Sequence, residues 1–153
     1  MDAENLEITI GEIEVRYISH TKISSRPTLK TPESIYQVFL QTWDKEKIEL
    51  VEQFKVLLLN RANRVLGICT LTSGNATGTI ADPKQVFALA LKANAVQVVI
   101  AHNHPSGSLT PSRADMELTN KMRVAGEYLD IKVLDHLIVT AEGYYSFACE
   151  GHI

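Results

Sequence analysis

The segment from Val96 to Ala101 is an apolar run, interrupted only by Gln97, that lies between two stretches with helical periodicity. A run of this length without apolar–polar alternation predicts a strand that is buried on both faces. One helix is expected before it, from Asp82 to Ala93, and another after it, from Ser112 to about Leu129. The segment therefore favours a layered α/β fold in which helices cover a sheet.

Four further strands are expected, in two pairs. They run from Glu52 to Leu59, Arg64 to Leu71, Ile131 to Val139 and Tyr144 to Ala148. The polar residues Asn60 to Asn63 join the first pair, which suits an antiparallel hairpin, and the second pair turns at Gly143. Strands and helices follow one another without strict alternation, so the sequence predicts an α/β sandwich with a mixed sheet between helices.

The N-terminal part carries weaker signals. From Ile8 to Ile18 apolar and polar residues roughly alternate, which predicts a strand or hairpin broken at Gly11, and a loop is expected to follow. Thr31 and Pro32 then combine a capping hydroxyl with a proline at the first helical position, which predicts a helix start. We expect a strand and loop segment over residues 1–30 and one domain over residues 31–153, because 153 residues can enclose a single core.

Charge and cysteine content narrow the functional classes. A formal net charge of −3 and a calculated pI near 5.9 give no sign of the broad basic surface that non-specific nucleic-acid binding needs. Cys69 and Cys149 have no paired-cysteine spacing, so neither a disulfide framework nor a cysteine zinc site is expected. The N-terminal residues are acidic without an apolar run, and no segment is apolar enough to span a membrane, so we expect a cytoplasmic protein.

A metal site is predicted directly after the buried strand. His102 and His104 are two residues apart, so on an extended backbone both imidazoles point to the same side and can reach one ion. Asp115 falls in the first turn of the next helix. Imidazole nitrogen and carboxylate oxygen suit tetrahedral zinc, and three protein ligands leave the fourth position to water. The pattern therefore predicts one catalytic zinc ion per chain, because structural zinc usually has protein atoms at all four positions.

A hydrolytic zinc site also needs a group that receives the proton of the activated water and passes it to the leaving group. Glu52 is the candidate, because in the strand that it opens its side chain lies on the core-facing row. Glu46 and Glu49 lack this placement and are weaker candidates. Ser112, three residues before Asp115, is the candidate donor of a hydrogen bond to the oxyanion of a tetrahedral intermediate.

These residues also have purely structural interpretations. Ser112 and Asp115 match a helix capping pattern, in which both side chains bind backbone N–H groups. Asp115 nevertheless falls on the inward-facing stripe of its helix, where an unpaired carboxylate is costly and a metal ion removes the cost. Glu52 can equally be an exposed acid at the end of a strand.

Asp135 and His136 suggest a catalytic dyad. His136, however, shares a strand face with Leu134 and Ile138 in regular alternation. This placement favours a buried neutral histidine with a backbone partner over a ligand. The sequence therefore leaves the roles of Asp135 and His136 open.

Taken together, these residues resemble a known motif. Glu52, His102 with His104 and Pro105, and Ser112 with Asp115 are similar to the JAMM motif of the JAB/MPN metallohydrolases. Within that group the chain most resembles the RadC-like branch. The resemblance rests on Glu52 with Phe54, Leu58 to Asn60, His102 to Gly107, Pro111 to Asp115, Asp135 to Ile138 and Tyr145 to Phe147. It covers about Thr31 to Gly151, and as a set its motifs are highly specific.

The resemblance implies a JAB/MPN-like sandwich of the cytidine-deaminase-like type over residues 31–153, with zinc on His102, His104 and Asp115. It further implies Glu52 as general base and Ser112 as oxyanion donor, in agreement with the interpretation of the residues themselves. Members of the wider group cleave peptide or isopeptide bonds, including those of ubiquitin-like conjugates. The expected substrate is therefore a peptide or isopeptide.

Two other functions stay open. The RadC-like branch carries a DNA-repair name, which motivates a nucleic-acid factor from repair or mobile elements, with Arg61, Arg64, Lys84 and Lys92 as local basic residues. Longer RadC-like proteins begin with a helix-hairpin-helix module that nothing before Thr31 resembles. A scaffold that binds a partner without turnover is the other alternative, against which the complete set of ligand types weighs. The sequence predicts no oligomeric state.

Overall fold

The structure, a computed structural model, describes residues 11, 14, 17–74 and 81–153. Within them, one five-stranded sheet has the order β2-β1-β3-β4-β5. The strands are β1 (Gln53–Leu59), β2 (Val65–Ser73), β3 (Gln97–Asn103), β4 (Lys132–Val139) and β5 (Tyr144–Ser146). β3 and β4 are parallel, whereas the other neighbouring pairs are antiparallel. The sheet is therefore mixed, which confirms the predicted sheet type.

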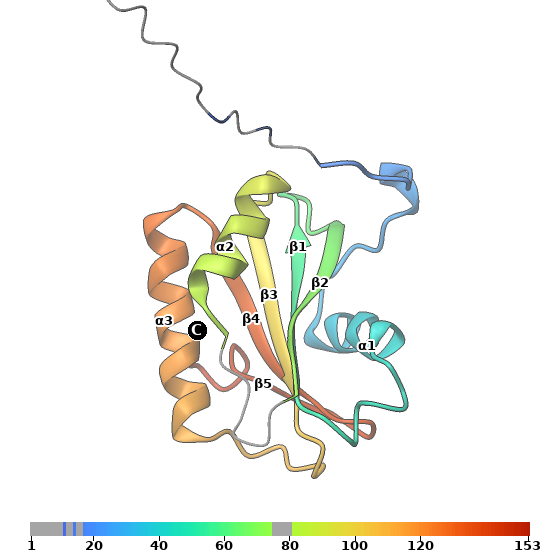
Figure 1. The fold of residues 1–153 in the computed structure, drawn as a ribbon, viewed down its shortest axis with the longest axis vertical. Helices are drawn as coiled ribbons and strands as arrows, with labels where there is room; N and C mark the ends of the chain where they lie inside the picture. Colours follow the sequence, from blue (N-terminus) through green and yellow to red (C-terminus); the bar gives the residue numbers. More distant parts are fainter. Residues whose placement is uncertain (1–10, 12–13, 15–16, 75–80) are drawn as a thin grey trace, which may run out of the picture.

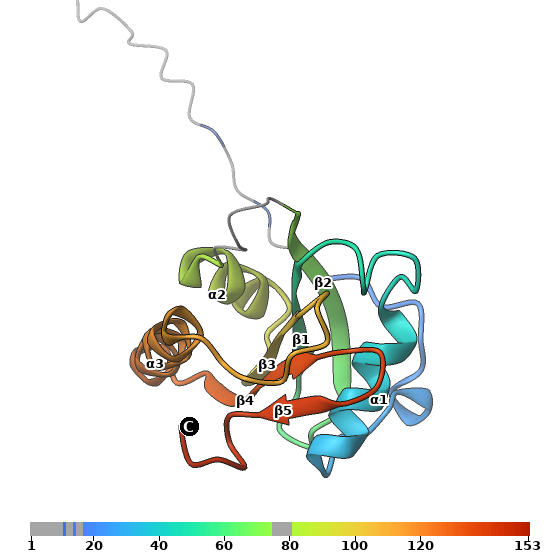
Figure 2. The same ribbon diagram turned by 90° about the horizontal axis from the view of Figure 1, so that it is seen from below.

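Helices cover both faces of this sheet and complete the α/β sandwich (Figure 1; Figure 2). α1 (Pro32–Thr42) lies on one face, and α2 (Pro83–Lys92) and α3 (Arg113–Tyr128) lie on the other. A short 3-10 helix, η1 (Ile23–Ser25), precedes α1. The predicted ranges of α2 and α3 differ from the observed ones only by the cap residue at each end.

Each α-helix begins at the cap that the sequence predicted. At Thr31, Asp82 and Ser112 a side-chain oxygen accepts a hydrogen bond from a backbone N–H two or three residues later, at distances of 2.9–3.1 Å. These bonds satisfy N–H groups that have no partner inside the helix. The cap at Ser112 also fixes where the first turn of α3 lies relative to the end of β3.

The sheet divides the core into two clusters. On the α2 and α3 side, the buried residues include Phe54, Val56, Leu58, Val86, Phe87, Val98, Ile100 and Met122. On the α1 side, they include Ile35, Phe39, Trp43, Leu57, Leu59, Val99, Ala101 and Leu137. β1 and β3 therefore contribute alternate residues to the two clusters, as strands buried on both faces do.

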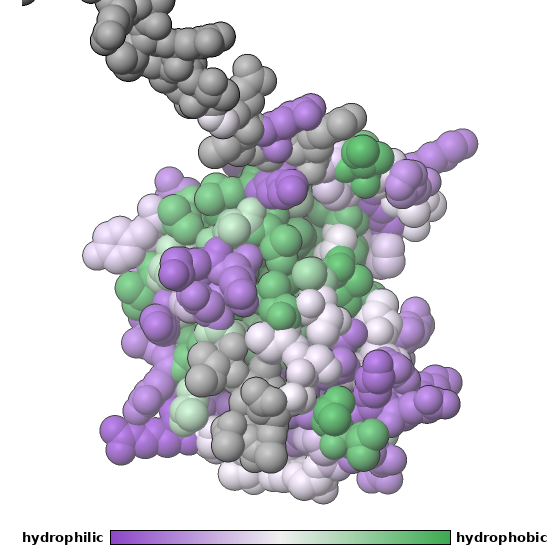
Figure 3. Space-filling view, in the orientation of Figure 1, coloured by the Kyte–Doolittle hydropathy of each residue, from purple (hydrophilic) through white to green (hydrophobic). Residues whose placement is uncertain are grey.

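One edge of the sheet is only partly covered. Leu66 and Leu71 of β2 pack against the cluster beneath α2 but stay partly buried, as does Leu89 of α2. Figure 3 shows hydrophobic residues gathered on this face and hydrophilic residues around its margins.

Among the described residues, no helix combines the length and apolar character that crossing a membrane requires.

The pairing of β3 with β4 contains an irregularity that the sequence did not indicate. Val98 pairs with Val133, but Val99 pairs with Asp135, so Leu134 is an extra residue in β4. Leu134 packs against the α1-side cluster, whereas the side chain of His136 lies on the α3 side. The prediction that Leu134 and His136 share a face was wrong, because a bulge interrupts the alternation of a strand.

Two other expectations concern the ends of the chain. The strand predicted from Ile8 to Ile18 falls mostly on residues outside the described ranges, and the described residues within it form no strand. β5 is shorter than predicted, because it ends at Ser146 rather than at Ala148. The division of the chain at residue 30 stays a prediction.

Candidate metal centre

His102 and His104 lie at the carboxyl end of β3, in the middle of the sheet. His102 is buried within β3, between Phe54 of β1 and Ile138 of β4. His104 follows the strand, and its backbone N–H donates to the carbonyl of Val139 at 3.2 Å. The main chain thus stays extended up to His104, so the two imidazoles point to the same side, as their spacing predicted.

A tight turn follows His104. The N–H of Gly107 donates to the carbonyl of His104 at 2.9 Å, and Gly107 has a φ of 80°. Pro105 suits the position after the first turn residue because its ring fixes φ, and glycine adopts a positive φ without strain. The turn brings the carbonyl of Ser108 back to the imidazole of His104, with Nδ1 and the oxygen 2.8 Å apart.

Asp115 reaches the two histidines from the first turn of α3. Its Oδ2 accepts a hydrogen bond from the N–H of Ser112 at 2.7 Å, which completes a capping box. Its Oδ1 lies 3.3 Å from His102 Nε2, and Oδ2 lies 3.8 Å from His104 Nε2. The capping and ligand interpretations therefore hold together, because one carboxylate serves both contacts.

The separations of these atoms fit a small tetrahedral cation. His102 Nε2 and His104 Nε2 are 3.1 Å apart, and one ligand atom from each of His102, His104 and Asp115 lies within 4.8 Å of the other two. Ligands bound to zinc at about 2.0–2.1 Å in tetrahedral geometry lie roughly 3.3 Å from one another. The group can thus hold a metal ion with little movement of its atoms.

The hydrogen-bond partner of His104 fixes its tautomer. A carbonyl oxygen only accepts, so His104 Nδ1 must carry the hydrogen that is shared with the carbonyl of Ser108. In a neutral imidazole the other nitrogen then has a lone pair. His104 Nε2 therefore presents a lone pair to the cluster.

A longer chain of hydrogen bonds fixes the tautomer of His102. Thr119 Oγ1 donates to the carbonyl of Asp115 at 2.7 Å, so it accepts from His136 Nδ1, which lies 2.6 Å away. His136 Nε2 is then an acceptor and receives the hydrogen of His102 Nδ1 at 2.9 Å. His102 Nε2 is left with a lone pair that faces His104 and Asp115.

This chain requires a neutral His136. Burial lowers the pKa of His136 well below its ordinary value, since a charged imidazole is costly in the core. The ring also stacks on Phe147, with centroids 4.5 Å apart. His136 is therefore buried and neutral as the sequence favoured, but its partners are the side chains of His102 and Thr119 rather than the backbone.

The carboxylate of Asp115 supplies negative charge to the cluster. Burial acts to raise the pKa of its carboxyl group, but the neighbouring imidazole of His102 and the hydrogen bonds to Ser112 outweigh burial and hold the pKa below its ordinary value. Two lone pairs and one carboxylate thus converge on a common point. Such a set of donor atoms could hold a metal ion.

Asp135 has a different place in the fold. Its Oδ1 accepts from the N–H groups of His136 and Ala148 at 2.7 and 3.0 Å, and its Oδ2 accepts from the hydroxyl of Ser146 at 2.6 Å. Burial raises the pKa of its carboxyl group. Asp135 joins β4 to the segment after β5, and within the described residues its side chain makes no hydrogen bond with the imidazole of His136.

Glu52 and Ser112 are not members of the cluster of His102, His104 and Asp115. Glu52 is half-buried and directly precedes β1, two residues before Phe54, whose partner in β3 is His102. Continued for two residues beyond its last pair, the same antiparallel register would place Glu52 opposite His104. Ser112 is exposed at the start of α3, and its hydroxyl accepts from the N–H of Asp115. The catalytic roles of both residues stay predictions.

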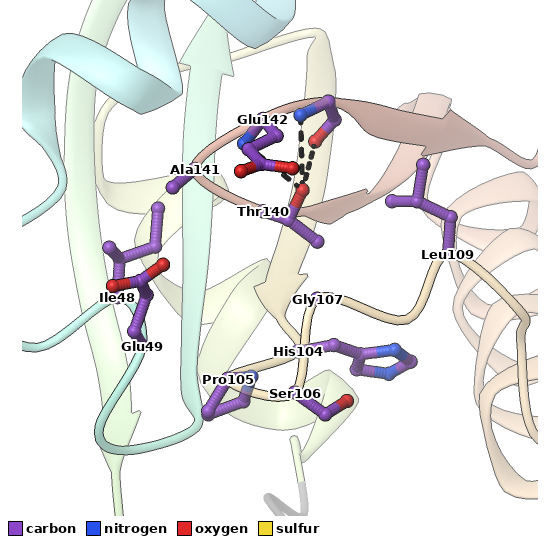
Figure 4. A pocket seen from close by; sticks show the side chains of 11 residues that line it. Ile48, Glu49, His104, Pro105, Ser106, Gly107, Leu109, Thr140, Ala141 and Glu142 are labelled. Carbon is purple, nitrogen blue, oxygen red and sulfur yellow. Dashed lines mark hydrogen bonds between the residues drawn. The ribbon is translucent and has the colours of Figure 1, made fainter.

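A cavity of about 390 Å³ adjoins the cluster (Figure 4). The loop from His104 to Leu109 forms one wall, and the turn from Thr140 to Gly143 forms another. Ile48 and Glu49 lie across the cavity from the imidazole of His104. The sequence did not indicate this cavity, because its walls come from three segments that are distant along the chain.

Comparison with known families agrees with this arrangement. The RadC-like JAB domain matches residues 29–152, which is most of the chain and includes every member of the cluster. This chain belongs to the RadC-like JAB domain family. The match confirms the resemblance drawn from the sequence and agrees with the observed α/β fold.

Three curated relatives of this RadC-like JAB domain are UPF0758 proteins from bacteria. The one from Flavobacterium johnsoniae is 50% identical over 65% of this chain and 44% of its own length. The relative from Thermotoga maritima is 42% identical over 67% of this chain and 46% of its own length. The relative from Rubrobacter xylanophilus is 37% identical over 94% of this chain and 62% of its own length. The chain therefore spans about half the length of the curated relatives it matches.

The hydrogen-bond chain behind His102 leads to a first prediction for this RadC-like JAB domain. Valine at position 119 keeps the volume of threonine but removes the hydroxyl, which leaves His136 Nδ1–H without its acceptor. His102 then loses the group that fixes its tautomer. We expect Thr119→Val to lower zinc affinity about 10- to 100-fold in competition with a chelator. Thr42→Val is the control, because the hydroxyl of Thr42 donates only to carbonyls within α1. Equal affinities for both variants would contradict the role of Thr119.

Proposed function

We propose that this chain is a zinc-dependent hydrolase of amide bonds in a peptide or isopeptide substrate, with one zinc ion bound by His102, His104 and Asp115. The observation that carries the proposal is the convergence of two imidazole lone pairs and a carboxylate at tetrahedral separations. Two imidazoles and a carboxylate suit zinc, and three ligands are the usual protein complement of a catalytic rather than a structural zinc ion.

Zinc held by three protein ligands lowers the pKa of a coordinated water to about 7 and polarises a carbonyl group. The protein must then accept a proton near this position and deliver it to the leaving amine. The place of Glu52 supports this role: Glu52 is half-buried and lies two residues before Phe54, the residue that pairs with His102. In this proposal Glu52 is the general base and then the general acid.

Ser112 is proposed to stabilise the oxyanion of the tetrahedral intermediate. Its Oγ accepts a hydrogen bond from the N–H of Asp115, so the hydrogen of its own hydroxyl stays available for a further acceptor. The capping box holds this hydroxyl at the start of α3, beside the carboxylate that faces His102. A donor fixed in this way needs no reorganisation when the charge on the substrate oxygen develops.

The proposal is tested by metal analysis and a substrate screen. We expect the purified chain to contain one zinc ion per molecule and a chelator to remove it. In a library of peptides and isopeptides, hydrolysis should stop with chelator and return with added zinc. His104→Ala, which lacks one ligand, is the matched control and should bind little zinc. A chain that binds no divalent ion, or hydrolysis that the chelator leaves unchanged, would overturn the proposal.

Nucleic-acid binding stays the second prediction from the sequence. It is tested by measuring DNA affinity against salt concentration, because phosphate contacts predict a steep decrease as salt increases. A DNA affinity that does not change with salt, or no measurable DNA binding, would rule out this prediction. A partner-binding role without turnover is separated from hydrolysis by the same peptide and isopeptide library.

A further inference from the structure

Asn103 lies between the two histidines in sequence, but its side chain points to the opposite face of the sheet. It is fully buried, with 0% of its surface exposed. Its Nδ2 donates to the carbonyls of Ile48 and Val51 at 2.7 and 2.9 Å, and its Oδ1 accepts from the N–H of Gln53 at 2.7 Å. Ile48 and Val51 belong to the segment that leads into β1, and Gln53 is the first residue of β1.

Two of these bonds bracket Glu52. Val51 precedes it and Gln53 follows it, so the backbone is held by Asn103 on both sides of the residue. The carbonyl of Glu52 itself accepts from the N–H of Gly74 at 2.8 Å, at the end of β2. The main chain at Glu52 is therefore attached to β3 through a side chain and to β2 through a backbone bond.

The chemistry of these contacts selects asparagine. Two carbonyl oxygens need donors and one N–H needs an acceptor, and a carboxamide presents two donors and an acceptor on one planar group. Aspartate has the same shape but offers no hydrogen to the carbonyls of Ile48 and Val51. Because the amide is fully buried, water cannot replace any bond that a substitution removes.

We propose that Asn103 is the positioning residue that sets Glu52 opposite the metal cluster. The inference rests on the proposed function, since it gives Glu52 its role there. β3 presents His102, a member of the cluster, on one face of the sheet. It presents Asn103, which holds the backbone on both sides of Glu52, on the other face. The distance from the acid to the ligands is thus fixed within one short piece of backbone, even though Glu52 lies on a separate segment.

The test is a double-mutant cycle between Asn103 and Glu52. With wild-type Glu52, Asn103→Ala should lower kcat on the substrate found in the library at least about 10-fold, with KM changed less than about threefold. In the Glu52→Gln background, the same substitution should change kcat less than about twofold, because the acid that Asn103 positions is already gone. Zinc content should stay at one ion per chain in every variant.

A second readout needs no substrate. In protein loaded with Co²⁺, the visible spectrum changes with pH, and its midpoint depends on the acid beside the ion. Glu52→Gln should move the midpoint, Asn103→Ala should move it in the same direction, and the double variant should move it no further than Glu52→Gln alone. Asn60→Ala is the matched control. Asn60 also binds backbone N–H groups, but in the turn between β1 and β2, and its variant should keep the wild-type midpoint.

The outcomes separate the two proposals. If the wild-type chain binds neither zinc nor Co²⁺, the proposed function fails and this inference fails with it. If the ion binds and Glu52→Gln moves the midpoint but Asn103→Ala does not, only the positioning role is overturned. Equal effects of Asn103→Ala on kcat in both backgrounds would also overturn it, because a purely structural residue acts independently of Glu52.

Amide hydrogen exchange tests the same arrangement in the wild-type protein, in case Asn103→Ala does not fold. The N–H of Gln53 donates to Asn103 Oδ1, so we expect it to exchange as slowly as the amides inside β1. Exchange at the rate of an open loop would show that the anchor does not hold this segment, and would overturn the inference.

Discussion

A Glu52→Gln variant is expected to keep one zinc ion per chain and to hydrolyse its substrate about 10²- to 10⁴-fold more slowly than the wild type. Glutamine has the size of glutamate but cannot take up a proton, so the substitution removes proton transfer and leaves the fold intact. The zinc content should not change, because the ligand atoms come from His102, His104 and Asp115. Measuring kcat together with bound zinc separates these two effects.

The matched control for Glu52→Gln is Glu46→Gln. Glu46 is an exposed acid in the turn region before β1, and its placement in the sequence made it a weaker candidate for the same role. Its variant should retain the wild-type kcat. A Glu52→Gln enzyme with wild-type turnover would exclude Glu52 as general base, and loss of zinc from that variant would instead indicate a ligand role.

The metal cluster could be predicted from the sequence because its geometry is mostly local. His102 and His104 share one strand end, and the two-residue period of a strand places their side chains together. The place of Asp115 in the cluster was harder to predict, since Ser112 and Asp115 also form a capping box. In the structure the same carboxylate forms the cap and faces the histidines, so the two interpretations are compatible.

The support around the cluster could not be predicted, because it depends on contacts between distant segments. Thr119 and His136 meet only when α3 packs on β4, and Asn103 meets Ile48 and Val51 only when the segment before β1 crosses the end of β3. No period in the sequence links such residues. The bulge at Leu134 has the same character, because one extra residue in β4 is visible only in its pairing with β3.

The second large effect is expected at Gly126, near the end of α3, where the chain turns back into β4. Gly126→Ala should destabilise the fold by about 3 kcal/mol, the upper part of the range for overpacked sites. A β-carbon there would lie 2.3 Å from the carbonyl oxygen of Ile131 and 3.3 Å from side-chain atoms of Phe87 and Val133. Alanine normally favours a helix over glycine by about 1 kcal/mol, so the expected loss runs against helix propensity.

The carbonyl oxygen of Ile131 is backbone and cannot turn aside as a flexible side chain can. The helix end must therefore move away from β4, which also strains the bond from the N–H of Ile131 to the carbonyl of Gly126. A loss of about 3 kcal/mol in a domain of this size lowers Tm by roughly 6–12 °C, which thermal unfolding measures directly. Gly67→Ala is the control, because a β-carbon there meets nothing within 4 Å. If both variants unfold at the wild-type temperature, α3 and β4 do not approach as closely at Gly126 as the structure has them.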